Sequence, residues 1–201
     1  MRGFVPTPDE IVDVMVGKLF ADKPPTQRST LLDPGCGPGA FIGGVLRWCR
    51  QKRLDVPQIV GYENAPDRYA EAQANFGTLQ SVTLHQEDFL RCHSDPFDYV
   101  IGNPPYVPIT GLAASEKAEF RRTFLSAQGR FDLYLLFFEQ ALRLLAPGGR
   151  LVFITPEKFL YVKTAESLRR VLGNYHVKEI ELVSEATFGK LVTYPTITTV
   201  D

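Results

Sequence analysis

The stretch Asn103-Pro104-Pro105-Tyr106 places a carboxamide, two prolines and an aromatic ring directly after an apolar run, residues 97–102. The run predicts a buried strand. The prolines predict a rigid loop at its end, because proline fixes φ and cannot extend a β-ladder. Such a loop presents carbonyl acceptors without neighbouring N–H donors, beside a ring face. These groups suit a flat amine, whose hydrogens need acceptors and whose ring needs a stacking surface.

A glycine-rich turn, Asp33-Pro34-Gly35-Cys36-Gly37-Pro38-Gly39, lies upstream of this loop. Glycine permits positive φ and a close approach of the backbone to a ligand. Asp33 places a carboxylate where an ammonium group could be bound and a pyrophosphate would be repelled. No Gly-Lys-Ser/Thr follows, so the turn is not a phosphate-binding P-loop. Taken alone, the turn is compatible with several adenosyl or nucleotide ligands, or with a tight connection between a strand and a helix.

Two acidic positions extend this pattern. Glu63 closes the next predicted strand, where an acid can accept both hydroxyls of a ribose. Asp88 and Phe89 follow the strand after that, and a carboxylate beside an aromatic ring suits an adenine. The plain alternatives are a solvated strand end for Glu63 and a chance pair for Asp88 and Phe89.

The elements that must hold these residues alternate along the chain. Strands are predicted over residues 30–33, 58–63, 81–85, 98–102, 150–155, 177–183 and 196–200, and helices over 41–50, 67–76, 133–145 and 165–172. A further helix follows Thr7-Pro8-Asp9-Glu10, which has the form of a capping box. Residues 146–149 are expected to end the long apolar helix, and residues 110–129 to form a mobile helical excursion. The alternation predicts an α/β, Rossmann-like fold with a seven-stranded, mainly parallel sheet and helices on both faces.

Composition sets the remaining limits. The chain has 201 residues, 44% of them apolar and 22% charged, as expected for one soluble globular domain. It has no apolar run near the roughly 20 residues of a membrane helix and no N-terminal signal segment, so no membrane association is predicted.

The cysteines and histidines do not form a pattern typical of a metal site. The chain has three of each, which are Cys36, Cys49, Cys92, His85, His93 and His176. The odd number of cysteines predicts reduced thiols in a cytoplasmic protein. No histidine has a carboxylate or cysteine at ligand spacing, so no metal is expected. Cys36 is expected to pack rather than to act as a nucleophile.

In their order along the chain, these motifs resemble those of a known family. They are similar to the S-adenosylmethionine-dependent DNA adenine-N6 methyltransferases of the γ-ordered type, found in type I and type II restriction-modification systems. The motifs that carry the resemblance are Thr7-Pro8, Asp33 to Phe41, Glu63, Asp88-Phe89, Asn103-Pro104-Pro105-Tyr106, the segments 129–134 and 144–149, and Phe188.

This resemblance implies a set of roles. The cofactor would be S-adenosyl-L-methionine, and the substrate a flipped-out adenine of double-stranded DNA. Thr7, Gly35 and Gly37 would hold the methionine moiety with Asp33 near its ammonium, Glu63 would bind the ribose, and Asp88 and Phe89 would contact the adenine. Asn103, which also borders the cofactor, and the Pro104 carbonyl would accept from the target amine, in a catalytic loop completed by Pro105. Tyr106 and Phe188 would stack on the target base.

The charge of the chain departs from this picture. DNA affinity depends on neutralising phosphates, yet the net charge is −1. Arg121, Arg122 and Arg130 are the one basic concentration worth naming near the expected substrate face, and they are equally compatible with an ordinary solvated surface. Residues 1–201 are therefore expected to be a catalytic domain that binds DNA weakly. A target-recognition domain beyond Asp201, absent here, or a partner subunit would supply specificity.

Other functions share part of the pattern. Protein-glutamine N5 and rRNA guanine-N2 methyltransferases also carry Asn-Pro-Pro-Tyr, because each must present acceptors to an NH₂ group. Thr7-Pro8 and Phe41 favour the DNA adenine reading over these. A silent adenosyl-binding subunit is a third possibility, although it would not need an intact Asn103–Tyr106 set.

Overall fold

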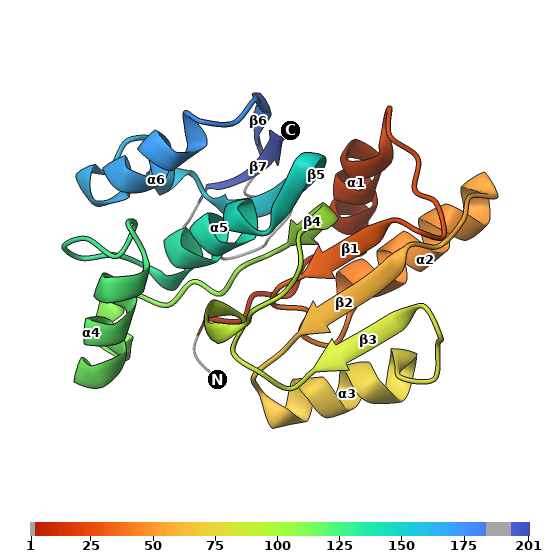
Figure 1. Ribbon diagram of the computed structural model, residues 1–201, viewed down its shortest axis with the longest axis horizontal. Coiled ribbons are helices and arrows are strands. Elements are labelled where there is room, and N and C mark those ends of the chain that lie inside the picture. The colour runs from red at the N-terminus through yellow and green to blue at the C-terminus, as the bar shows by residue number, and fades with distance from the viewer. Residues whose placement is uncertain (1–2, 184–193) are drawn as a thin grey trace.

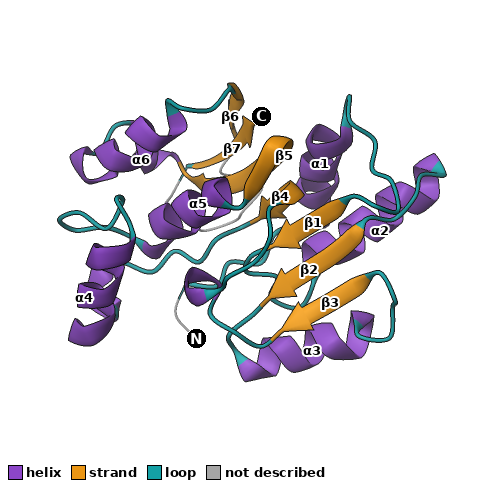
Figure 2. Ribbon diagram, viewed as in Figure 1, coloured by secondary structure: helices purple, strands orange, loops and turns teal. Residues whose placement is uncertain are grey.

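The computed structural model of the 201-residue chain describes residues 3–183 and 194–201. Seven strands form one sheet in the order β3-β2-β1-β4-β5-β7-β6, with helices on both faces (Figures 1 and 2). β1 to β5 run parallel, and β7 runs antiparallel to both of its neighbours. The predicted fold class is confirmed.

The described elements follow the predicted order. The strands are β1 Thr30–Asp33, β2 Gln58–Tyr62, β3 Val82–His85, β4 Phe97–Gly102, β5 Leu145–Pro156, β6 Val177–Leu182 and β7 Pro195–Val200. The α-helices are α1 Asp9–Phe20, α2 Ala40–Lys52, α3 Pro66–Phe76, α4 Ala114–Thr123, α5 Leu133–Arg143 and α6 Glu166–Leu172. Four short 3₁₀ turns lie over Phe89–Arg91, Ile109–Gly111, Glu157–Leu160 and Lys163–Ala165.

Two apolar cores hold the three layers together. α1 and α2 cover one face of the sheet, where Val12, Val16 and Ile42 are completely buried. α5 and α6 cover the other face, where Leu136 and Phe138 are completely buried. Because both faces are covered, the central parallel strands are apolar almost throughout rather than alternating.

Two local predictions were wrong. Thr7-Pro8-Asp9-Glu10 does not form a capping box: Pro8 is the N-cap, and no side chain of the described residues caps α1. The segment 146–149 does not end a helix, because α5 stops at Arg143 and β5 begins at Leu145. The register of β5 against β4 shifts between Phe97 and Tyr99, and Gly148, within the shifted part of β5, has φ +75°.

The excursion after β4 contains the predicted helix, α4, but the segment is attached to the body. Buried Glu139 of α5 accepts from the backbone N–H groups of Leu125 and Ser126 at 3.0 and 2.7 Å. Phe120 and Phe124 are each 2% exposed and pack into the core on the α5 face. These contacts fix the segment where it borders the site described below.

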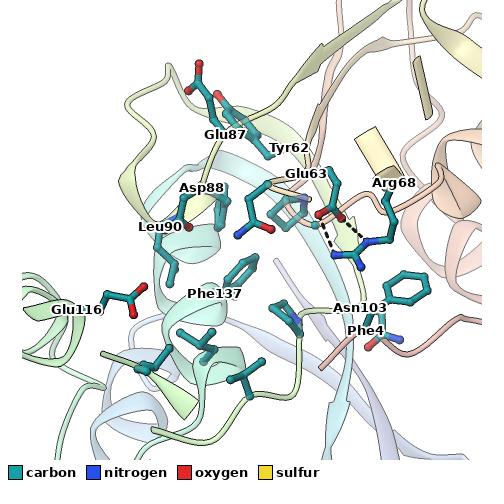
Figure 3. Close-up of a pocket in the computed structure, with 18 of the residues that line it drawn as sticks. Phe4, Tyr62, Glu63, Arg68, Glu87, Asp88, Leu90, Asn103, Glu116 and Phe137 are labelled. Carbon is teal, nitrogen blue, oxygen red and sulfur yellow. Dashed lines mark hydrogen bonds and ion pairs between the residues drawn. The ribbon is translucent and has the colours of Figure 1, made fainter. Parts of the chain in front are cut away.

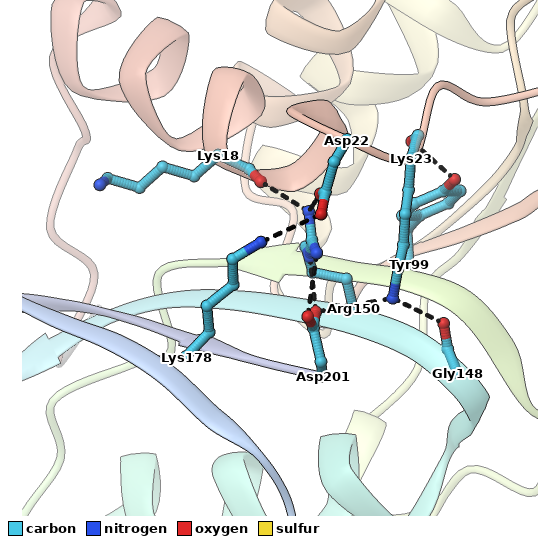
Figure 4. A network of polar contacts seen from close by, with 8 residues as sticks. All are labelled: Lys18, Asp22, Lys23, Tyr99, Gly148, Arg150, Lys178 and Asp201. Atoms are coloured by element: carbon cyan, nitrogen blue, oxygen red, sulfur yellow. Dashed lines mark hydrogen bonds and ion pairs between the residues drawn. The ribbon is translucent and has the colours of Figure 1, made fainter.

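At the amino ends of the parallel strands, a buried arginine joins the first helix to the last strand (Figure 4). Arg150 of β5 donates to both carboxylate oxygens of Asp201, at 2.6 and 2.9 Å, and to the carboxylate of Asp22. Lys178 of β6 reaches Asp22 at 3.2 Å. The network therefore links α1, β5, β6 and the end of β7.

The strand order also fixes where a ligand can bind. β1 and β4 are neighbours in the sheet, with Leu32 opposite Val100, although they are far apart in sequence. The chain after β1 turns toward β2, whereas the chain after β4 turns toward β5. In open α/β sheets the crevice outside such a switch point is the usual ligand site. Separately, no helix of the described residues is long and apolar enough to cross a membrane.

Candidate active site

Two adjoining cavities open at the carboxyl edge of the sheet. The first has a volume of about 250 Å³, and its lining includes Glu63, Asp88, Phe89 and Asn103 (Figure 3). The second has a volume of about 520 Å³, and its lining includes Thr7 and Gly39. Phe4, Gly35 and Asn103 line both cavities.

Asn103 stands at the junction with its carboxamide in a defined orientation. Its Nδ2 donates to the Val5 carbonyl at 3.0 Å and to Thr7 Oγ1 at 3.1 Å. Both amide hydrogens are therefore used by the N-terminal segment. Its Oδ1 is buried and has no hydrogen-bond partner among the described residues. A buried acceptor without a donor is costly, so Oδ1 is prepared to accept from a ligand.

Residues 3–7, the N-terminal strap, border both cavities: Phe4 lines both, and residues 5–7 line the second. Tyr106 N donates to the Gly3 carbonyl at 3.0 Å, which ties the strap to the Asn-Pro-Pro-Tyr loop. Thr7, which fails as a helix cap, instead supplies an acceptor for Asn103. The Thr-Pro motif and the loop after β4 thus act on the same carboxamide.

The glycine turn follows β1 and passes beneath the strap. Gly37 and Gly39 have positive φ, +54° and +99°, which explains their residue type. A Cβ on Gly37 would come within 2.8 Å of the Phe4 ring. Cys36 donates its backbone N–H to the Tyr62 carbonyl at 2.9 Å, and burial raises the pKa of its thiol, so the side chain packs as an inert group.

Asp33 is completely buried, and the backbone N–H of Gly35 faces its carboxyl. Burial raises the pKa of its carboxyl to about 8, and the nearby Glu63 carboxylate acts in the same direction. Asp33 is not among the described residues that line either cavity, so it lies behind the cavity wall.

Glu63 follows β2 and is 6% exposed. Its Oε1 accepts from Ala65 N at 2.7 Å and from Arg68 Nη2 at 2.9 Å, and its Oε2 accepts from Arg68 Nε at 3.1 Å. Glu63 lines the first cavity, where the sequence predicts a ribose acceptor. It does not stand free there, however, because Arg68 already holds both oxygens (Figure 3).

Asp88 and Phe89 lie on the far side of the first cavity. Asp88 accepts from Leu90 N at 3.0 Å and pairs with Arg91 at 3.2 Å, and burial raises the pKa of its carboxyl. Phe89 is 1% exposed and packs against the rings of Tyr62 and Phe137. The pair presents a carboxyl and an apolar wall side by side.

Of the two aromatic residues predicted to stack on a base, the structure describes Tyr106 only. Tyr106 is half-buried, donates weakly to the Ile154 carbonyl at 3.4 Å and packs edge-on against Tyr134. Pro105 lines the first cavity, whereas Pro104 is buried behind it. Phe188 lies outside the described residues.

The surroundings of the site carry charge but no ion-binding cluster. In residues 3–183 and 194–201, no group of three or more His, Cys, Asp or Glu side chains could hold a metal ion. Arg121, Arg122 and Arg130 are exposed on α4 and in the loop that follows it. α4 also contributes Glu116 and Phe120 to the first cavity, whereas none of these three arginines is among the described residues that line either cavity.

Sequence reasoning missed Phe4, Val5 and Arg68. Arg68 lies on the first helical turn of α3, five positions beyond Glu63, a spacing that could have suggested an ion pair. Phe4 and the Val5 carbonyl meet the site only because the strap folds back over it. No local pattern in the sequence indicates that contact.

Comparisons with known proteins agree with this architecture. A protein from Listeria monocytogenes assigned to the class I S-adenosylmethionine-dependent methyltransferases superposes with a TM-score of 0.80 at 23% identity, covering 96% of this chain and 59% of that one. The fold is thus that of the class I S-adenosylmethionine-dependent methyltransferases, with the candidate site at the switch point of the sheet.

The family is shown by sequence. Residues 53–188 match the model of the Eco57I restriction-modification methylase family, and the chain belongs to that family. The Type II methyltransferase M.TthHB8I of Thermus thermophilus is 30% identical over 94% of this chain and 43% of its own length. The Type II methyltransferase M.PaeR7I of Pseudomonas aeruginosa is 27% identical over 98% of this chain and 40% of its own length. The chain thus spans less than half the length of these relatives.

Proposed function

We propose that the chain is the methyl-transferring domain of a DNA methyltransferase that acts on the N6 amine of adenine in a restriction-modification system. The observation that carries this proposal is the Asn103 carboxamide. Its NH₂ is held by Val5 and Thr7, and its buried Oδ1 has no hydrogen-bond partner among the described residues. That arrangement suits a substrate NH₂ group.

The chemistry requires such an acceptor. The lone pair of an exocyclic adenine amine is delocalised into the ring, which makes the nitrogen a poor nucleophile. An acceptor at Asn103 Oδ1, helped by the Pro104 carbonyl, would favour a pyramidal nitrogen and stabilise the positive charge that develops on it. Tyr106 and Phe188 would offset the stacking that the base loses when it leaves the duplex.

The residues present also fit S-adenosyl-L-methionine. When bound, this cofactor supplies an electrophilic methyl group on a sulfonium sulfur. Glu63 would hold its ribose, and Asp88 with Phe89 its adenine, in the first cavity. Thr7, Gly35 and the backbone at Gly37 would border the methionine moiety, with the Asp33 carboxyl behind them. No metal is needed for this chemistry, because the leaving group is a neutral thioether.

Double-stranded DNA is the proposed partner, bound weakly by this chain. A net charge of −1 offers little phosphate neutralisation. Arg121, Arg122 and Arg130 are exposed on α4, which contributes to the first cavity, and in the loop that follows it, and we assign them phosphate contacts. Sequence choice would come from a further domain or a specificity subunit, in keeping with the greater length of the relatives.

The test is a methyl-transfer assay with labelled cofactor and four acceptors: duplex DNA, single-stranded DNA, ribosomal RNA and a release factor that carries the Gly-Gly-Gln motif. We expect label in DNA, recovered as N6-methyladenine. Label in RNA or in glutamine would replace the DNA assignment by one of the other planar NH₂ substrates. Cofactor binding without any transfer would favour a silent subunit.

A further inference from the structure

Arg68 lines the first cavity, where the proposed function places the nucleoside, and it has no role in that proposal so far. We propose that Arg68 determines how many ribose hydroxyls Glu63 can bind. It occupies one side of the Glu63 carboxylate and leaves a single acceptor position for a nucleoside hydroxyl. This inference rests on the proposed function, and it names a specificity-determining residue of that site.

The Glu63 carboxylate has a limited capacity to accept hydrogen bonds. A carboxylate offers about four lone-pair positions, two on each oxygen. Among the described residues, Oε1 accepts from Ala65 N and Arg68 Nη2, at 2.7 and 2.9 Å, which fills it. Oε2 accepts from Arg68 Nε at 3.1 Å and keeps one position. A ribose that needs two acceptors from Glu63 therefore finds one.

Arg68 is not an exposed side chain that can simply leave. Its side chain is 15% exposed, and that of Glu63 is 5% exposed, so the pair is shielded from water. On its other side, the guanidinium stacks on the Phe4 ring, 4.7 Å from its centroid. A planar guanidinium that holds a carboxylate with two N–H groups and stacks on a ring is fixed in position and orientation.

Phe4 is 41% exposed and contacts the glycine turn. Its ring lies over Gly37, where a Cβ would meet it at 2.8 Å, and its neighbour Val5 accepts from Asn103. Glu63, Arg68 and Phe4 all line the first cavity (Figure 3). Arg68 thus joins the ribose acceptor to the strap that orients the catalytic carboxamide. It is expected to stay in place when a ligand enters.

The experiment measures binding of S-adenosylhomocysteine and its 2′-deoxy and 3′-deoxy forms by calorimetry, with no DNA present. In the wild-type protein, we expect loss of one hydroxyl to weaken binding about tenfold or more, as for a hydrogen bond to a charged group, and loss of the other to change it less than about threefold. In Arg68→Met, both losses should weaken binding about tenfold. The matched control is Arg170→Met, which breaks an exposed arginine–glutamate pair on α6 and should keep the wild-type pattern.

The outcomes separate the two proposals. Wild-type protein that loses affinity equally for both deoxy forms overturns the role of Arg68, even if Arg68→Met fails to fold. A folded Arg68→Met that keeps the one-hydroxyl pattern overturns it as well. Wild-type protein that binds no S-adenosylhomocysteine contradicts the proposed function instead.

Discussion

Asn103 does its proposed work only if its carboxamide is held with Oδ1 toward the substrate. Two acceptors hold its NH₂, the Val5 carbonyl and the Thr7 hydroxyl. The sequence placed Thr7 beside the cofactor but gave its side chain a role in capping a helix. Its contact with Asn103 joins residues 96 positions apart, and local spacing could not reveal it.

Thr7→Val tests this restraint, because it removes the hydroxyl and keeps the shape. The Val5 carbonyl remains, so we expect a partial effect: the single-turnover rate of methyl transfer at saturating DNA and cofactor should fall about two- to tenfold, the value of one neutral hydrogen bond. Thr83→Val, on the exposed side of edge strand β3, is the control and should be unchanged. An unaltered rate in Thr7→Val would remove Thr7 from the machinery.

Tyr106 should contribute its ring rather than its hydroxyl, whose bond to the Ile154 carbonyl is long at 3.4 Å. Tyr106→Ala should weaken affinity for DNA with a mismatched target adenine roughly 5- to 100-fold, as expected for one stacked base. Tyr106→Phe keeps the ring and should bind as the wild type does. Equal affinity of the Ala variant would argue against stacking. Affinity for S-adenosylhomocysteine should be unchanged in both variants.

Among the elements, the alternation of strands and helices was predictable because buried parallel strands and amphipathic helices leave strong local patterns. Those patterns predict the succession of strands along the chain from β1 to β7. The start of β5 was missed because Ala146-Pro147-Gly148-Gly149 is typical of a helix end. In the structure this segment instead belongs to β5, which pairs with β4 from Leu145 onward. The packing of residues 110–129 was missed because it depends on Glu139, an acid in a mostly apolar helix.

Glu139→Ala should release the segment that follows α4. The backbone N–H groups of Leu125 and Ser126 would lose their buried acceptor, and we expect the free energy of unfolding to drop by roughly 2–3 kcal/mol. Hydrogen exchange should rise over residues 114–131 more than elsewhere. Glu166→Gln, which breaks an exposed pair with Arg170, should cost under about 1 kcal/mol and serves as the control. Unaltered exchange over 114–131 in Glu139→Ala would show that other contacts hold the segment.

At the scale of the whole molecule, the Arg150 network joins the end of α1 to the end of β7. It lies at the amino ends of the parallel strands, whereas the cavities lie at their carboxyl ends. The Arg150 guanidinium lowers the pKa of the Asp201 and Asp22 carboxyls below their usual range. A lowered pKa means that each carboxylate stabilises the fold above the unfolded pKa near 4, and that this contribution is lost as pH falls through the folded value.

Arg150→Met should therefore be less stable than the wild-type protein at pH 7. The difference in unfolding free energy should narrow as pH falls from about 5 to about 2, because the carboxylates that Arg150 serves become protonated. Urea unfolding at a series of pH values measures it. A difference that is constant over this range would mean that Arg150 acts through packing alone.

The central claim of the proposed function is that Asn103 accepts a hydrogen bond from the amine that receives the methyl group. The most direct measurement compares wild-type and Asn103→Ala protein, with nucleosides from labelled duplex DNA separated and S-adenosylhomocysteine affinity measured alongside. We expect N6-methyladenine from the wild-type protein, a rate lowered about 10²-fold or more in Asn103→Ala, and similar affinity for S-adenosylhomocysteine in both. Full transfer by Asn103→Ala, or a methylated product other than N6-methyladenine, would contradict the account.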